Sequence, residues 1–189
     1  MTFLSDKKRI MQRKDKSNIG AVDKPIEQLI DIINSKENYY TTSSCSGRII
    51  LIQIPLSGSK REAQFIYRTH KKGDYKELKD SLKKYDSTEK LWFRQEPAII
   101  HICAKDLKSA SKLLRIARRI GFKRGGLFEV EKHLMIELWS TEKIETIIAA
   151  EGKILISEDY LKILIFEANK RLERTWEKTN NLCEAVKKL

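Results

Sequence analysis

Residues 39–48, Tyr-Tyr-Thr-Thr-Ser-Ser-Cys-Ser-Gly-Arg, hold the densest group of potentially reactive side chains in the sequence. Six small hydroxyl or thiol side chains run from Thr41 to Ser46, and Gly47 and Arg48 follow directly. Hydroxyls and backbone N–H groups in such a segment can hold an anion or a carboxylate, and an arginine adds a planar fork of donors. The same composition is typical of an ordinary Ser/Thr-rich loop that bonds to its own backbone. We therefore expect a polar loop here, with or without a ligand.

Three other side chains could do chemistry, and each has an ordinary structural alternative. Cys45 would act as a nucleophile only beside a base that favours its thiolate form. Asp23 stands just before a Lys-Pro pair, where an aspartate commonly caps a helix, but its carboxylate could also accept a proton or offset a positive charge. His101 lies between Ile100 and Ile102, so it points away from them as a packed residue or as a base.

A surplus of basic residues is the second functional signal. The 189 residues include 38 Lys and Arg against 26 Asp and Glu, a formal charge of +12, which favours nucleic acid first and an anionic membrane surface second. Between residues 107 and 120 basic side chains recur on one helical face, at Lys108, Lys112, Arg115 and Arg119. Lys123 and Arg124 extend this charge. Such a stripe either follows phosphates or is a solvated helix face.

Composition excludes several classes of protein. No apolar run is long enough for a membrane span, and the first residues have no apolar segment like that of a secretory signal. Cys45, Cys103 and Cys183 form neither a disulfide framework nor a metal-binding pair. We expect a soluble, cytoplasmic protein without a bound metal. A Gly-rich strand–helix turn is also missing, which argues against a Rossmann fold.

The elements that must position these residues follow from hydrophobic periodicity. Helices are expected over residues 3–16, 26–33, 75–85, 107–120 and from Ser157 onward. Strands are expected at residues 49–54, 63–70, 91–95, 98–104, 126–131, 133–139 and 152–156. Short connections between strands favour an α+β fold with a mixed, mostly antiparallel sheet, flanking helices and a long C-terminal helix. The middle of the chain also suggests an internal β-β-α duplication.

The segment 41–48 resembles the signature of the tRNA wybutosine-synthesising protein 3 family, which reads Ser/Thr, any residue, Ser-Ser-Cys, any residue, Gly-Arg. The resemblance covers nearly the whole chain. Upstream it includes Asp15-Lys16-Ser17, Gly20, Asp23, Asn34 and Tyr39-Tyr40. Downstream it includes LWFRQEPAIIHICAKDL, GFK, ELWSTEK and SEDYL. One departure is Arg124-Gly125-Gly126, where the family pattern has a serine beside the glycine.

The resemblance implies a chemistry that the residues alone do not. The family transfers a methyl group from S-adenosylmethionine to a ring nitrogen, N-4, of a tricyclic wyosine-type guanosine. That base lies beside the anticodon of tRNA(Phe). The motif, an aspartate and a histidine form the family's active site, and Asp23 and His101 match those two positions. The cofactor would need a cradle other than a Gly-rich loop, and residues 41–48 are the candidate for it.

We therefore expect residues 1–189 to form a single methyltransferase domain, with a helical N-terminal segment at 1–36 and a long helix at 157–189. The expected catalytic residues are Asp23, His101, Ser44 and Cys45. The expected cofactor-binding residues are Thr41, Ser43, Ser46, Gly47 and Arg48. The expected tRNA contacts are Lys112, Arg115, Arg119, Lys123 and Arg124. No obligate protein partner is expected. The alternatives are a non-catalytic RNA-binding protein and a hydrolase that uses Cys45.

Overall fold

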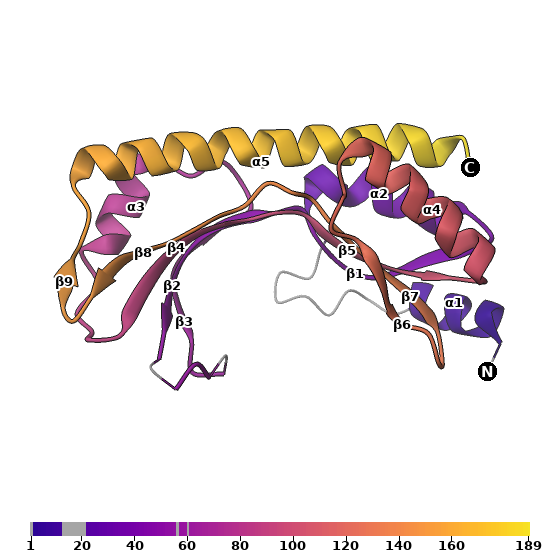
Figure 1. Ribbon diagram of the computed structural model, residues 1–189, viewed down its shortest axis with the longest axis horizontal. Coiled ribbons are helices and arrows are strands. Elements are labelled where there is room, and N and C mark those ends of the chain that lie inside the picture. The colour runs from indigo at the N-terminus through magenta and orange to yellow at the C-terminus, as the bar shows by residue number, and fades with distance from the viewer. Residues whose placement is uncertain (1, 13–21, 56, 60) are drawn as a thin grey trace. The chain divides into compact units, whose positions relative to one another are not determined.

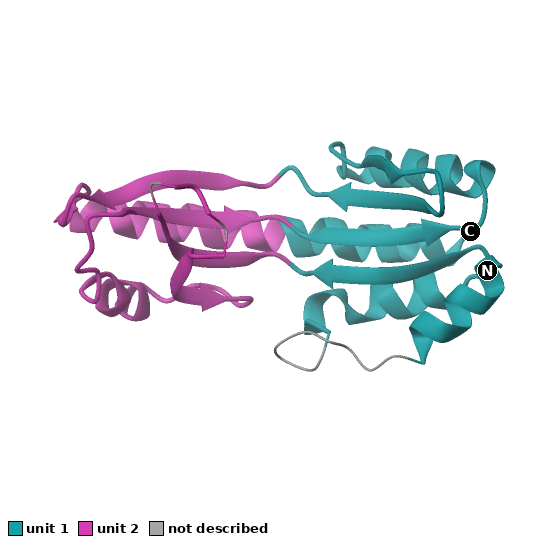
Figure 2. Cartoon of the chain, turned by 90° about the horizontal axis from the view of Figure 1, so that it is seen from below, with its two compact units in different colours: residues 1–46, 98–141, 175–189 teal, residues 47–97, 142–174 magenta. Residues whose placement is uncertain are grey.

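The chain folds into two compact units, each built from segments distant in sequence. The computed structural model describes residues 2–12, 22–55, 57–59 and 61–189. The first unit contains residues 1–46, 98–141 and 175–189, and the second contains residues 47–97 and 142–174 (Figure 2). Asp15-Lys16-Ser17, Gly20 and the end of the expected first helix lie outside the described residues. That residues 1–189 act as one methyltransferase domain stays a prediction.

The first unit is built on a four-stranded antiparallel sheet with the order β1-β5-β7-β6 (Figure 1). Its strands are β1 (Tyr39–Cys45), β5 (Ile99–Ala104), β6 (Gly126–Glu129) and β7 (Leu134–Trp139). Its helices are α1 (Phe3–Met11), α2 (Lys24–Ser35), α4 (Leu107–Ile120) and the C-terminal part of α5 (Glu158–Lys187). The strand β1 is an edge strand of this sheet.

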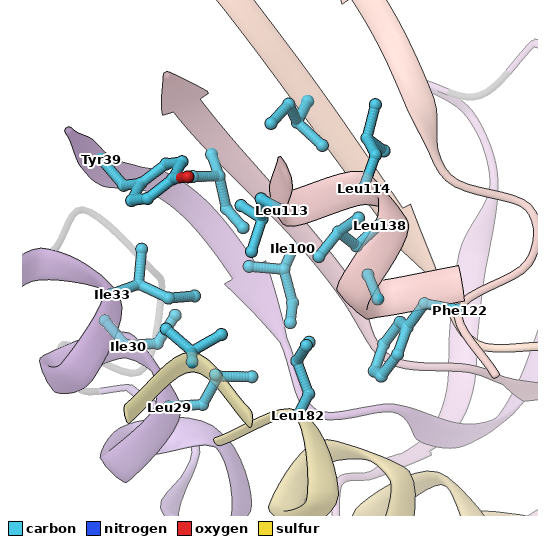
Figure 3. Close-up of a cluster of buried hydrophobic side chains, with 14 of the residues drawn as sticks. Leu29, Ile30, Ile33, Tyr39, Ile100, Leu113, Leu114, Phe122, Leu138 and Leu182 are labelled. Atoms are coloured by element: carbon cyan, nitrogen blue, oxygen red, sulfur yellow. The ribbon is translucent and has the colours of Figure 1, made fainter. Parts of the chain in front are cut away.

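One apolar cluster holds the first unit together (Figure 3). Leucines and isoleucines at helical spacing on α2 and α4 pack against β5 and β7, because 3.6-residue periodicity gathers them on one helix face. Alternate residues of the strands, including Ile100 and Leu138, point into the cluster. Leu182 of α5 completes it. The residues between them in the strands, among them His101 and Glu137, therefore face the other side of the sheet.

Helix α4 begins and ends as its sequence predicts. The carboxylate of Asp106 accepts a hydrogen bond from the backbone N–H of Ser109 at 2.7 Å, which is an N-cap. At the other end Gly121 has φ 116°, a left-handed conformation that glycine adopts without the Cβ clash of other residues.

The second unit is a five-stranded antiparallel sheet with the order β3-β2-β4-β8-β9. Its strands are β2 (Arg48–Ile54), β3 (Gln64–Thr69), β4 (Lys90–Glu96), β8 (Ile144–Ala150) and β9 (Lys153–Ile154). Helix α3 (Tyr75–Leu82) and the N-terminal part of α5 belong to it. The side chain of Asn169 in α5 bonds both to the N–H of Gly73, at 2.7 Å, and to its carbonyl, at 2.9 Å. These two bonds fix the turn that leads into α3.

The prediction of an α+β fold with antiparallel pairing and a long C-terminal helix is confirmed, and four details differ. Residues 39–45 form a strand rather than a loop, and β8 was not foreseen. There are two sheets, and the suggested duplication is not seen, because β2 and β3 are neighbours whereas β4 and β5 belong to different sheets. Within the described part of the chain, no helix has the length and apolar character needed to cross a membrane.

Two neighbouring glycines offer a matched test of packing beside β7. A Cβ on Gly125 would lie 2.7 Å from the backbone oxygen of Glu137, whereas a Cβ on Gly126 would meet no atom within 4 Å. Gly125→Ala should therefore lower the free energy of unfolding by about 1–3 kcal/mol, the usual cost of overpacking. Gly126→Ala should stay within about 0.5 kcal/mol of the unmodified protein. Urea denaturation measures both, and equal effects would contradict the close approach at Gly125.

Candidate active site

The hydroxyl-rich segment is the edge strand β1, and a bulge in it decides which side chain meets His101. Thr41 lies opposite Ile102 of β5, but Ser43, two residues on, lies opposite His101, so Thr42 is the extra residue of a β-bulge. Regular pairing would have put Thr42 there. The bulge therefore brings Ser43 to the same side of the sheet as His101.

His101 is bonded on both sides of its ring. Its Nδ1 lies 2.8 Å from Oγ of Ser43, and its Nε2 lies 2.8 Å from Oε1 of Glu137, the residue opposite it on β7. The side chains of His101 and Glu137 are 29% and 34% exposed, so both are half-buried but open to a ligand. The ring of Phe128 lies 5.1 Å from the imidazole and is itself exposed.

Asp23 holds the far end of β1. It occupies the N-cap position of α2 but makes no capping hydrogen bond there. Its Oδ2 instead accepts a hydrogen bond from the backbone N–H of Ser46 at 2.9 Å. Ser46 is buried. The simple capping role is therefore wrong for this carboxylate, which links the start of α2 to the residue that follows β1.

Asn34, near the other end of α2, makes the corresponding link to the beginning of the hydroxyl-rich segment. Its Oδ1 accepts from the backbone N–H of Thr41 at 2.8 Å and from the Thr41 hydroxyl at 3.2 Å. One helix thus fixes the segment at both ends, through Asn34 and Asp23.

The remaining motif residues lie apart from His101 or in the second unit. Ser44 is opposite Ile100, and Cys45 is opposite Ile99. Because both ring nitrogens of His101 are bonded to Ser43 and Glu137, Cys45 is not its partner. In the second unit Gly47 has φ 95°. The Nε of Arg48 donates to Glu96, and its guanidinium lies over the ring of Phe65 at 5.4 Å.

The basic residues of α4 form an exposed surface on the first unit. Lys112, Arg115 and Arg119 are exposed, and among the residues that the structure describes no carboxylate forms an ion pair with them. A groove of about 600 Å³ is lined by Arg115 and Arg119, with Leu107 and Leu127 among its other lining residues. Lys123 and Arg124 are exposed in the turn after α4.

Sequence reasoning missed Glu137 as a site residue, although a partial signal was present. Glu137 is the only carboxylate in the β7 sequence LMIELW, and it alternates with the buried Ile136 and Leu138. That pattern predicts a polar side chain on the open face of the sheet. The pairing of β5 with β7, which brings it to His101, is a tertiary feature.

Comparison with known proteins now adds a family. The model of the family described as "Methyltransferase TYW3" matches residues 5–188. A relative from Thermococcus sibiricus is 37% identical over 98% of this chain and 94% of its own length. A relative from Methanocaldococcus jannaschii is 34% identical over 94% and 93%. Both bear the name "tRNA(Phe) 7-((3-amino-3-carboxypropyl)-4-demethylwyosine(37)-N(4))-methyltransferase".

Solved structures agree with this relationship. The PH1069 protein from Pyrococcus horikoshii superposes with a TM-score of 0.90, at 35% identity, over 98% of this chain and 96% of its own. A hypothetical protein from Aeropyrum pernix has a TM-score of 0.77 at 28% identity, over 88% of this chain and 98% of its own. The matched family, the identities over almost the full length and the shared fold lead to one conclusion: this chain belongs to the methyltransferase family TYW3.

Proposed function

We propose that this protein transfers a methyl group from S-adenosylmethionine to the N-4 ring nitrogen of a wyosine-type guanosine beside the anticodon of tRNA(Phe). Membership of a methyltransferase family supports methyl transfer, and the names of its relatives support this substrate. One observation links the proposal to particular residues. In the segment Thr41–Ser46, Ser43 is hydrogen-bonded to His101 and the N–H of Ser46 to Asp23. Such a reaction on tRNA belongs in the cytoplasm.

The residues of the first unit suit S-adenosylmethionine. This group carries a sulfonium cation, and when bound it supplies an electrophilic methyl carbon. The carboxylate of Asp23 complements a cation, and the exposed hydroxyls of Ser43 and Ser44 can bond to its polar groups. From the family motif we propose cofactor contacts at Thr41, Ser43 and Ser46 of the first unit, and at Gly47 and Arg48, which begin the second unit. No residue set is assigned to a metal.

Methyl transfer needs alignment more than covalent help, so the protein's task is to position groups and to move one proton. Asp23 and His101 are the candidate groups for that proton. Ser44 and Cys45 of the motif are proposed as further catalytic residues. Asp23 is held by the Ser46 N–H, and His101 by Ser43 and Glu137. Fixed side chains of this kind lose little entropy when the substrate binds.

The exposed basic surface of α4 and the following turn is the proposed tRNA contact. Lys112, Arg115 and Arg119 lie on one helix without partner carboxylates among the described residues, so they are available for phosphates. Lys123 and Arg124 continue this surface. Lysines elsewhere are neutralised locally, such as Lys83 by Asp80 and Lys162 by Asp159.

Cofactor binding separates this proposal from a non-catalytic RNA-binding protein. Titration calorimetry with S-adenosylmethionine should show saturable binding, and a labelled-methyl assay on tRNA(Phe) that lacks the N-4 methyl group should show transfer. Normally modified tRNA(Phe) is the control and should accept no label. An absence of heat at millimolar cofactor, with tRNA still bound, would favour the RNA-binding alternative.

Asp23→Asn separates a catalytic carboxylate from a helix cap. Asparagine is as good an N-cap as aspartate and keeps an oxygen for the Ser46 N–H, but it removes the charge. We expect kcat to fall about 100-fold or more, the usual contribution of an acid–base group, while the melting temperature is retained. His101→Ala should have a similar effect on kcat.

The matched control is Asp74→Asn. Asp74 is the true N-cap of α3, where its side chain accepts from the Glu77 N–H at 3.0 Å. This variant should keep full activity. If Asp23→Asn behaves like Asp74→Asn, Asp23 is not part of the active site.

Salt dependence tests the tRNA surface. Arg115→Ala/Arg119→Ala should weaken tRNA binding and reduce the slope of log affinity against log salt by about 2, roughly one for each lost phosphate contact. The affinity for S-adenosylmethionine should not change. The control variant Lys83→Ala/Lys162→Ala removes the same charge from locally paired lysines and should leave the slope unchanged. An unchanged slope in the arginine variant would show that Arg115 and Arg119 of α4 do not contact tRNA phosphates.

A further inference from the structure

Three polar side chains form a row across the open face of the first unit's sheet. Ser43, His101 and Glu137 come from the neighbouring strands β1, β5 and β7, and each lies directly opposite the next. Both links in the row are 2.8 Å long. The motif contains only the first of these residues, so Glu137 has no role in the function proposed so far.

Hydrogen-bond chemistry fixes which ring nitrogen of His101 carries the proton. An ionised carboxylate can only accept, and a neutral imidazole has one donor and one acceptor. Because Nε2 faces Glu137, Nε2 must be the donor, so Nδ1 carries the lone pair and accepts from the hydroxyl of Ser43. The lone pairs of the Ser43 oxygen then remain for another donor. This assignment follows from the bonding network.

We propose that Glu137 is a positioning residue that holds His101 in this tautomer, so that Ser43 relays the proton lost by the methylated base to His101. The proposal rests on the proposed function and adds a residue to it. Ser43 becomes a catalytic residue as well as a cofactor contact.

The proposed step balances in atoms and charge. The target ring nitrogen bonds to the methyl carbon as the carbon–sulfur bond breaks, and the electron pair of that bond stays on sulfur. The base would become a cation unless it lost a proton. That proton passes to Oγ of Ser43, while the hydroxyl proton of Ser43 passes to Nδ1 of His101. The resulting imidazolium lies against the carboxylate of Glu137, and its proton leaves to water.

The surroundings of the row favour this role over a simple surface ion pair. The backbone of Glu137 lies close to Gly125, where a Cβ would be 2.7 Å from the Glu137 oxygen. Gly126 lies opposite Glu137 on β6 and adds no side chain there. Phe128 covers the imidazole. Thus the row is hydrogen-bonded along its length, partly shielded from water and accessible at its Ser43 end, which is exposed.

A double-mutant cycle tests the relay, with the labelled-methyl assay giving kcat and KM. Glu137→Gln should lower kcat about 100-fold with KM changed less than about twofold, because no negative charge then stabilises the imidazolium that forms during proton transfer, whereas substrate binding is unaffected. Ser43→Ala should also lower kcat. The double variant should be no slower than the slower single variant, because residues of one relay act as a unit. Multiplied effects, or a Glu137→Gln enzyme within about twofold of the original kcat, would overturn the proposal.

The control is Glu129→Gln on β6 of the same sheet. This change removes the same charge, and glutamine keeps an oxygen for the Glu131 N–H that Glu129 binds at 2.8 Å. Its kcat should stay within about twofold of the unmodified enzyme.

A second measurement needs no activity. Nitrogen-15 NMR of histidine-labelled protein at about pH 8, above the ordinary histidine range, should show His101 protonated at Nε2 and not at Nδ1. In Glu137→Leu, which has no acceptor for the Nε2 proton, this fixed tautomer should be lost. If the unmodified protein transfers no methyl group but shows this tautomer, the proposed function fails while the role of Glu137 in holding His101 stands. Protonation at Nδ1 in the unmodified protein overturns the proposal itself.

Discussion

The attachment of one short edge strand to one helix is the constraint on which this site depends. Serine-rich runs form strands weakly, because the serine side chains compete for the backbone hydrogen bonds, whereas threonine favours strands. In β1 that competition is countered at both ends by α2, through Asn34 at Thr41 and Asp23 at Ser46. The chain between these anchors has little freedom left. The bulge at Thr42 is the one irregularity, and it presents the Ser43 hydroxyl to the next strand.

The same sheet separates packing from chemistry by the alternation of its strands. Ile100, Ile102, Ile136 and Leu138 point into the apolar cluster, and the residues between them point the other way. His101 and Glu137 therefore lie outside the apolar core. Their hydrogen-bond partners are each other and Ser43. A site built on strands rather than on loops is precise in position, because each side chain inherits the register of the sheet. The exposed cations lie on α4, a separate element of the unit.

Much of this arrangement could be predicted from sequence, and the exceptions have physical causes. Helices α2 and α4 were predicted because their apolar residues recur at helical spacing. Strand β1 was mistaken for a loop because Thr-Thr-Ser-Ser has turn-like composition, and only its anchors to α2 and its pairing with β5 make it a strand. Asp23 has the sequence context of a cap, yet its carboxylate turns to Ser46, a partner 23 residues away. Glu137 was missed because strand register is decided by the whole sheet and not by local residues.

The discontinuous path of the chain also sets an order of assembly during synthesis. The apolar cluster of the first unit includes Leu182, Cys183 and Val186, all almost fully buried. These residues follow, in the chain, the whole of the second unit. During synthesis, β1 and the residues that bind its ends, Asn34 and Asp23, therefore leave the ribosome long before the apolar cluster that supports β1 can form. The second unit has all its strands available earlier, and we infer that nascent chains carry the site in an unfinished, protease-sensitive state until residues 175–189 have emerged.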